Sequence, residues 1–144
     1  MLRPIQTEDL DACADLFVST FAQPPWSESW DVSVVKKRLQ QIIDTPYSYG
    51  VVNDEGSVIA FAMGFSEPWH EGSHYYLKEM CVAHDRQREG IGTAILEYLS
   101  TSVKDLGASR IYLLTAVGDM SESFYKKNGF YTSPKMIMMA RRFE

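Results

Sequence analysis

The apolar residues of the first half of the chain follow a helical period. Between positions 10 and 21, and again between 34 and 43, they recur every three or four residues, as in an amphipathic helix. Because proline cannot continue a helix, we expect the first helix to end before Pro24-Pro25. The second should run from near Asp31 to Pro46.

Short runs rich in β-branched and aromatic residues then indicate strands. The predicted strands lie at 2–5, 49–52, 58–65, 75–82, 110–115 and from 130 onward, including 136–140. Asn53-Asp54-Glu55-Gly56 is typical of a hairpin turn between two of them. Helical spacing returns after Gly92 and stops at Gly107, and a short helix is expected at 121–128 before Gly129.

The order of these elements, β-α-α-β-β-β-α-β-α-β, defines the expected fold. A strand, a crossover helix and a strand between Tyr75 and Thr115 predict a parallel pair, whereas hairpins join strands elsewhere. We therefore expect a mixed α/β sheet with helices on its faces. No repeat or linker-like stretch interrupts the sequence, so a single domain over residues 1–144 is the simplest interpretation.

Composition narrows the function classes. Hydrophobic residues make up 45% of the chain and charged residues 23%, which is typical of a globular protein. The net charge of −5 argues against a nucleic-acid partner, because such binding needs a basic surface. The two cysteines make no disulfide framework, and neither a signal peptide nor an apolar run long enough for a membrane span is found. We expect a soluble, cytoplasmic protein with no membrane partner.

The strongest chemical signal is Gln87-Arg88-Glu89-Gly90-Ile91-Gly92, between a predicted strand and a predicted helix. Glycine lets the backbone turn tightly, and the free N–H groups of the following helix favour an anion such as a pyrophosphate. Neither a Walker A lysine nor the third glycine of a dinucleotide fingerprint is present. Taken alone, the segment equally fits a strand-to-helix turn that only needs glycine.

The wider segment from Met80 to Leu96 resembles the coenzyme A-binding segment of the GNAT superfamily of N-acetyltransferases. The signature of that superfamily, Gln/Arg-x-x-Gly-x-Gly/Ala, is satisfied by Gln87, Gly90 and Gly92. Phe124-Tyr125-Lys126-Lys127-Asn128-Gly129-Phe130 resembles a second segment, found near the end of these enzymes. Together the two motifs are more specific than either alone.

The resemblance implies a mostly antiparallel sheet with a central, splayed pair of parallel strands and helices on both faces. It also implies that acetyl-CoA is the cosubstrate and that no metal takes part. The acetyl group would pass directly to a primary amine of a small molecule or peptide, with aminoglycoside-like and polyamine-like acceptors included. A strand N–H near Val82 would polarise the thioester carbonyl. The implied coenzyme contacts are Met80, Cys81, Val82, Gln87, Arg88, Glu89, Gly90, Ile91, Gly92, Thr93 and Tyr125.

Tyr125 stands at the general-acid position of the resembled family. A phenol, whose pKa is about 10, can protonate a departing thiolate. The alternative is a core aromatic residue on an amphipathic helix beside Phe124. The chain departs from many relatives at Gly118, where an asparagine contacts the coenzyme, so that side-chain contact is not implied here.

The candidate general base is Glu79, a carboxylate in an otherwise apolar strand. Strict alternation places it on one face with Tyr75, Leu77 and Cys81. Partial burial would raise its pKa and let it accept a proton from an ammonium, directly or through water. The alternative is a carboxylate paired with a cation such as Lys78 or Arg110, or one exposed at an edge.

Trp26, Glu28 and Trp30 are the candidates for acceptor binding in the N-terminal half, because aromatic faces and a carboxylate attract a cation. Their segment, 24–30, resembles one found in GNAT proteins related to aminoglycoside 6′-N-acetyltransferases. Tyr75 is a further candidate for lining this site. The alternative is a loop whose tryptophans pack on the core.

Other interpretations fit parts of the sequence. His70-Glu71-Gly72-Ser73-His74 matches the zinc-hydrolase pattern H-E-x-x-H, but Pro68 and Gly72 leave no long helix for it. A non-catalytic acyl-CoA-binding or regulatory module on the same fold would use the glycine turn without chemistry at Tyr125 or Glu79. A homodimer is also compatible with the sequence, although no segment marks an interface.

Overall fold

The computed structural model describes residues 1–143. Contacts within the chain divide it into two compact units, one running from Met1 to Leu114 and one beginning at Thr115. Among the described residues, no helix is both long and apolar enough to cross a membrane.

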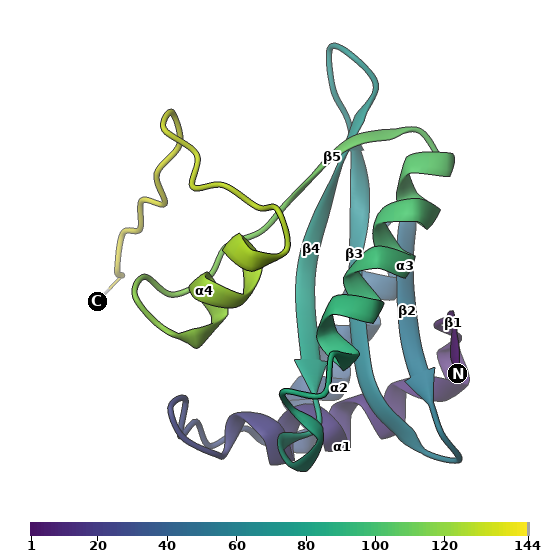
Figure 1. Cartoon of the computed structure of the whole chain (residues 1–144). Coiled ribbons are helices and arrows are strands. Elements are labelled where there is room, and N and C mark those ends of the chain that lie inside the picture. The colour runs from purple at the N-terminus through teal and green to yellow at the C-terminus, as the bar shows by residue number, and fades with distance from the viewer. Residues whose placement is uncertain (144) are drawn as a thin grey trace. The chain divides into compact units, whose positions relative to one another are not determined.

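The first unit is built on a five-stranded sheet (Figure 1). In sheet order the strands are β1 (Leu2–Pro4), β2 (Ser48–Asp54), β3 (Val58–Pro68), β4 (Ser73–Val82) and β5 (Ala108–Tyr112). Each neighbouring pair is antiparallel except β4 and β5, which are parallel. The mixed sheet and the parallel pair across a crossover helix are therefore confirmed.

Three helices belong to this unit. They are α1 (Leu10–Phe21), α2 (Val32–Asp44) and α3 (Ile91–Asp105). The start of α2 is fixed by Asp31, whose carboxylate accepts a hydrogen bond of 2.7 Å from the Ser33 backbone N–H. A 3-10 turn at Thr7–Asp9 leads into α1, where Arg3 donates two hydrogen bonds of 2.8 Å to the Asp9 carboxylate.

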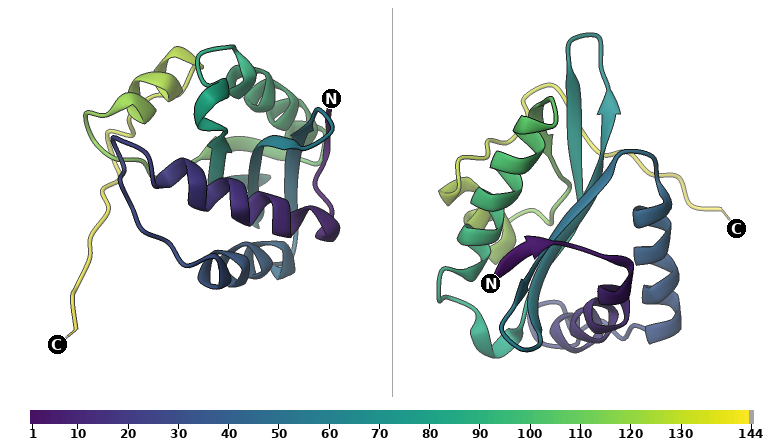
Figure 2. Two further views of the ribbon diagram at one scale, coloured as in Figure 1. Left: turned by 90° about the horizontal axis from the view of Figure 1, so that it is seen from below. Right: turned by 90° about the vertical axis from the view of Figure 1, so that its right-hand side faces the viewer.

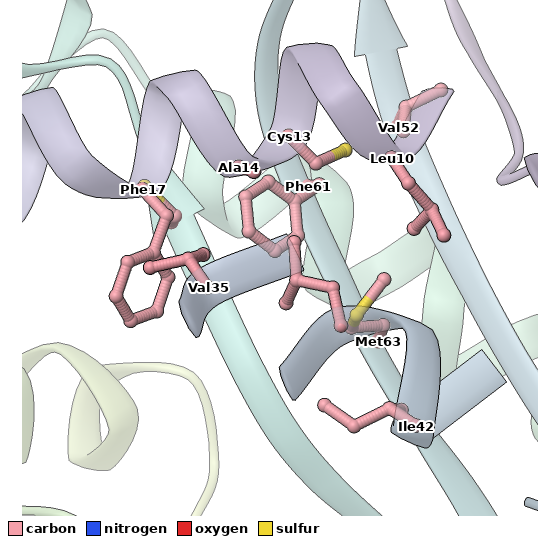
Figure 3. Packing of buried hydrophobic residues seen from close by; sticks show 11 residues of the cluster. Leu10, Cys13, Ala14, Phe17, Val35, Ile42, Val52, Phe61 and Met63 are labelled. Carbon is pink, nitrogen blue, oxygen red and sulfur yellow. The ribbon is translucent and has the colours of Figure 1, made fainter. Parts of the chain in front are cut away.

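Helices cover both faces of the sheet, with α1 and α2 on one side and α3 on the other (Figure 2, left). Figure 3 shows the first of these layers, where Phe17 of α1 and Val35 of α2 pack with Phe61 and Met63 of β3. The alternate strand residues, which include Ala62, are also buried and face α3. Both layers therefore hold β3 and β4 rigidly between helices.

Regular alternation breaks in the middle of β4. Met63 pairs with Glu79 but the next residue, Gly64, pairs with Leu77, so Lys78 is an extra residue in a β-bulge. A bulge exchanges the two faces of the strand beyond it. Glu79 and Cys81 consequently share the face of Met63, toward α1 and α2, whereas Leu77 faces α3. The prediction that Glu79 shares a face with Tyr75 and Leu77 is therefore wrong, because it assumed strict alternation.

Gly64 makes room for this bulge. A Cβ atom built on Gly64 would lie 1.8 Å from the Tyr76 carbonyl oxygen and 3.1 Å from the Lys78 nitrogen. Both of these are backbone atoms, which cannot swing aside as the end of a flexible side chain can. The face that Glu79 presents therefore depends on a glycine in the neighbouring strand.

The second unit contains α4 (Met120–Lys127). Asp119 caps it by accepting hydrogen bonds from the backbone N–H groups of Ser121 and Glu122, at 2.9 and 3.2 Å. The strands predicted from 130 onward and at 136–140 are absent from the described structure, where residues 130–143 form no strand. Their β-branched and apolar residues suit a strand, but a strand also needs a hydrogen-bonded neighbour, which composition cannot supply.

Candidate active site

The glycine turn forms the start of α3. Gly90 is the N-cap residue with φ of +81°, a left-handed conformation that side chains rarely adopt, and no side chain of residues 1–143 caps this helix. The first N–H groups of an α-helix have no intrahelical acceptor and carry partial positive charge. A Cβ atom on Gly90 would meet no other heavy atom within 4 Å. The start of α3 therefore combines uncapped N–H groups with open space beside Gly90, two features that suit an anion site.

Side chains hold this turn against the end of β4. The Gln87 side-chain amide donates a hydrogen bond of 3.1 Å to the Val82 carbonyl oxygen. Arg86 pairs with Glu89 at 3.2 Å and with Glu55 of the β2–β3 turn at 3.4 Å. The Arg86 charge is thus already neutralised by protein, whereas Arg88 is exposed and makes no ion pair with residues 1–143.

β4 has an open edge beside the turn. Its pairing with β5 ends at Tyr76 and Tyr112, although β4 continues to Val82, and the two strands diverge in Figure 1. The Ala83 N–H points toward β3, where it donates to Ile59 at 2.8 Å. Because successive backbone groups point to opposite edges, the Val82 N–H points to the edge that β5 has left. The backbone of the predicted contacts Met80–Val82 therefore borders the gap between the parallel strands.

Glu79 lies on the other side of this strand segment, against α2. Its Oε1 accepts a hydrogen bond of 2.5 Å from Arg38 Nε, and its side chain is only 11% exposed. Burial raises the pKa of the Glu79 carboxyl, while the hydrogen bond from Arg38 acts in the opposite direction. The cation paired with Glu79 is thus Arg38. Sequence analysis missed it because only the bulge and the packing of α2 bring these two residues together.

The tryptophan segment connects to the same ion pair. The Arg38 guanidinium lies 5.9 Å from the centre of the Trp30 ring, and Trp30 Nε1 donates a hydrogen bond of 2.9 Å to Glu28. Trp30 also packs edge-on against Phe17, at 5.2 Å between ring centres. The structure therefore brings Trp30, Glu28, Arg38 and Glu79 into one cluster, in which Trp30 both packs on the core and borders the ion pair.

Trp26 has a more peripheral place. Its ring packs edge-on against Phe21, with 5.0 Å between ring centres, and the residue stays partly exposed. Packing on the core, one of the two alternatives for the tryptophans, is thus observed for Trp30, whereas Trp26 packs on Phe21 at the margin of the core. Both tryptophans are also partly exposed, so each keeps a surface that an acceptor can contact.

Tyr75 does not line an open site. It is completely buried, and its hydroxyl donates a hydrogen bond of 2.6 Å to the Tyr49 carbonyl oxygen. Burial raises its pKa. The prediction of Tyr75 as an acceptor contact is therefore corrected: its place in the strand puts it under α3, with no surface for a ligand. Burial likewise raises the pKa of the Cys81 thiol to about 12, which keeps that thiol protonated and unreactive.

Tyr125 belongs to the second unit, on α4. Its ring is half-buried between Phe124 and Phe130, at 5.2 and 5.5 Å between ring centres. The Phe130 N–H donates to the Tyr125 carbonyl oxygen at 3.0 Å, which closes the end of the helix. The aromatic-Tyr and Gly-Phe parts of the second motif therefore fold onto one another.

The H-E-x-x-H pattern lies on a hairpin. His70, Glu71 and Gly72 form the turn between β3 and β4, and His74 is a strand residue whose ring stacks on Trp69 at 4.6 Å. The zinc-hydrolase pattern needs both histidines on one face of a helix. The geometry that the zinc interpretation requires is thus not formed.

Comparison with known proteins identifies the family. Residues 13–130 match the model of the Acetyltransferase (GNAT) family, so the match covers most of the chain. The chain belongs to this family of acetyltransferases.

Solved structures share the fold. A possible acetyltransferase from Clostridium difficile 630 has a TM-score of 0.81 at 18% identity, covering 100% of this chain and 98% of that chain. An aminoglycoside acetyltransferase from an uncultured soil metagenomic sample, solved in complex with sisomicin, gives 0.77 at 15%, with coverages of 100% and 96%. Aminoglycoside N-acetyltransferase AAC(6')-Iy, solved in complex with CoA, gives 0.77 at 13%, with coverages of 99% and 95%. At such identities the likeness concerns the fold.

Proposed function

We propose that this protein is an acetyl-CoA-dependent N-acetyltransferase that acts on a primary amine. The observation that carries the proposal is the uncapped start of α3 beside the open edge of β4. The first feature suits the pyrophosphate of the coenzyme, and the second suits its pantetheine arm, which can hydrogen-bond with strand backbone. Membership of the GNAT acetyltransferase family supports the same assignment.

In this proposal the backbone does most of the coenzyme binding. The N–H groups between Gln87 and Thr93 hold the pyrophosphate, and Gln87 itself fixes the turn to β4. Arg88 adds an exposed positive charge beside the turn. The Val82 N–H is positioned to polarise a carbonyl lying in the gap, where acetyl-CoA supplies the activated acetyl thioester.

The chemistry then needs a proton acceptor for the ammonium and a proton donor for the thiolate. Glu79 serves as the acceptor, directly or through water, because its burial favours the protonated form. Tyr125 serves as the donor, through its phenol hydroxyl. Trp26, Glu28 and Trp30 contribute to the acceptor side, where the aminoglycoside acetyltransferases among the similar structures make a small amine the first choice for testing.

Thermal unfolding with and without acetyl-CoA tests the coenzyme site. Ligand at about 100 times its dissociation constant adds roughly 2.7 kcal/mol to the stability of the folded state. For a chain of this size the midpoint should rise by several degrees, on the order of 3 °C or more. An unchanged midpoint at millimolar acetyl-CoA would overturn the coenzyme site. A rise without thiol release across a broad amine panel would instead support the non-catalytic binding module.

A further inference from the structure

The ion pair between Arg38 and Glu79 has a donor face that the protein does not use. Arg38 turns its Nε toward Glu79, while its Nη1 and Nη2 atoms donate no hydrogen bond to any of residues 1–143. The side chain is 39% exposed, so these donors are accessible from solvent. A guanidinium presents a planar fork of N–H groups that matches a carboxylate.

The guanidinium has contacts on two sides. Its Nε donates the 2.5 Å hydrogen bond to Glu79, and its Cζ lies 5.9 Å from the centre of the Trp30 ring. The Trp30 indole is itself anchored by Glu28 and by edge-on packing against Phe17. A cation restrained on two sides in this way binds an anion with less loss of side-chain freedom than a free surface arginine.

The pairing changes which acceptor suits the site. Four charges act at this position: Glu79 and Glu28 are negative, and Arg38 and Lys78 are positive. A purely cationic amine would approach a carboxylate that is already paired with Arg38, and it would meet the guanidinium at short range. A molecule with an ammonium and a carboxylate side by side places opposite charges against the two partners. The positive Arg38 and negative Glu79 are thus the electrostatic complement of a zwitterion.

We propose that the acceptor carries a carboxylate next to its amine, as an α-amino acid does. Arg38 binds the carboxylate through Nη1 and Nη2, and the amine faces Glu79. This inference rests on the proposed N-acetyltransferase function and names its substrate class. The ammonium first loses a proton to Glu79. The nitrogen then forms a bond to the acetyl carbon as the carbon–sulfur bond breaks. The departing sulfur takes a proton from the Tyr125 hydroxyl, which regains one from the nitrogen as the amide forms, and Glu79 releases its proton to solvent. The products are an N-acetyl amino acid and the coenzyme thiol.

Matched acceptors test the inference on the unmodified protein. Each of a set of L-α-amino acids is compared with its C-terminal amide, which keeps the amine and side chain but lacks the negative charge, and with the polycationic aminoglycoside kanamycin. Thiol release gives kcat and KM for each. Loss of a charge-assisted pair should lower kcat/KM for the amides by about 10- to 100-fold, mainly through KM.

Variants at Arg38 locate the effect. Arg38→Gln should remove the preference for the acid over the amide, and Arg38→Lys should restore part of it. Because Arg38→Gln also alters Glu79, any loss shared equally by acids and amides reports on Glu79, whereas a loss confined to acids reports on carboxylate binding. Lys37→Gln, an exposed cation on the same helix, is the matched control and should leave the preference unchanged. Thermal midpoints show that each variant is folded.

The outcomes separate this inference from the proposed function. Acetylation of amides or kanamycin as efficient as that of the amino acids would overturn the zwitterion assignment and leave the transferase standing. The same holds if Arg38→Gln keeps the full preference for acids. Absence of turnover with every acceptor would overturn the transferase itself, and with it the substrate class.

Discussion

The two sides of the β4 carboxyl half, Glu79–Val82, are built from different chemical groups. On the side of the gap, the glycine turn and the Val82 N–H offer backbone groups, which recognise a phosphate or an amide whatever the neighbouring side chains are. On the side of α2, the proposed recognition depends on Arg38, Glu79 and Trp30. The first side suits a cosubstrate common to a family, and the second can change substrate by a few substitutions.

The comparison also separates rigid from adjustable parts. The backbone site depends on left-handed Gly90 and on the divergence of two strands, neither of which a side-chain change elsewhere easily alters. The side-chain site depends on an ion pair whose arginine is partly exposed. Variants that affect one side and spare the other are the sharpest test of this division.

The largest effect is expected from Gly90→Glu. The new carboxylate would lie beside the proposed pyrophosphate, and repulsion of about 4 kcal/mol at short range corresponds to about 1,000-fold weaker acetyl-CoA binding. Isothermal titration calorimetry measures it. Gly90→Gln is the matched control, because it has the same strain at φ of +81° without the charge. Equal affinities of the two variants would contradict the phosphate site.

The next largest effect is expected from Gly64→Ala, and it concerns the free energy of unfolding. Its methyl group would lie 1.8 Å from the Tyr76 carbonyl oxygen, so the bulge must distort, at a cost of about 3 kcal/mol. Urea unfolding measures the loss. Gly56→Ala, in a turn with φ of +90° and no atom within 4 Å, should cost only about 1 kcal/mol. Similar losses in both variants would show that crowding at Gly64 does not set the bulge.

Glu79→Gln should lower kcat/KM by about 100-fold without changing acetyl-CoA affinity, because a general base is lost. Burial raises the pKa of the Glu79 carboxyl, so the rate of the unmodified protein should fall as the pH drops through that raised pKa and the carboxylate becomes protonated. The variant should lack this acid limb. A pH–rate profile with the same limb in both proteins would assign the proton to another group.

Tyr125→Phe should have the smallest effect, about a 10-fold fall in kcat with coenzyme affinity nearly intact. A thiolate is a weaker base than, for example, an alkoxide, so it needs less help from a proton donor in order to leave. Tyr131→Phe, an exposed tyrosine of the same unit, is the control and should be neutral. Loss of folding in Tyr125→Phe with normal kcat in the folded fraction would favour the core role beside Phe124 instead.

Sequence predicted the backbone side better than the side-chain side, for a physical reason. The glycine turn, the crossover helix and the hairpin at 53–56 are local features, in which residues close in sequence determine the geometry. The pairing of Arg38 with Glu79 joins residues 41 positions apart, and the face of Glu79 is set by a bulge beside Gly64. A prediction that assumes strict alternation of side chains between the two faces of a sheet cannot detect an extra residue inside a strand.

Tyr75 shows the same limit. An aromatic residue in a strand near a proposed site is equally plausible as lining or as core, and only the three-dimensional environment shows that its hydroxyl has a buried partner in Tyr49. The strand predicted at 136–140 failed in another way. The residue types were suitable, but strand formation depends on a partner elsewhere in the chain.

The bulge at Lys78 also governs which changes of chain length β4 can accept. A substitution at Lys78 leaves the strand's residue count intact, but a single deletion between Leu77 and Glu79 would restore strict alternation. The side chains from Glu79 to Val82 would keep their present faces, because Leu77 and Glu79 would still pair with Gly64 and Met63 and only the extra residue would be lost. A deletion within 79–82 removes no such extra residue, and it would turn the side chains on one side of it to the opposite face. A relative that is one residue shorter at this point can therefore present the same functional side chains, and an alignment with this chain has to place the gap at Lys78 before it compares them.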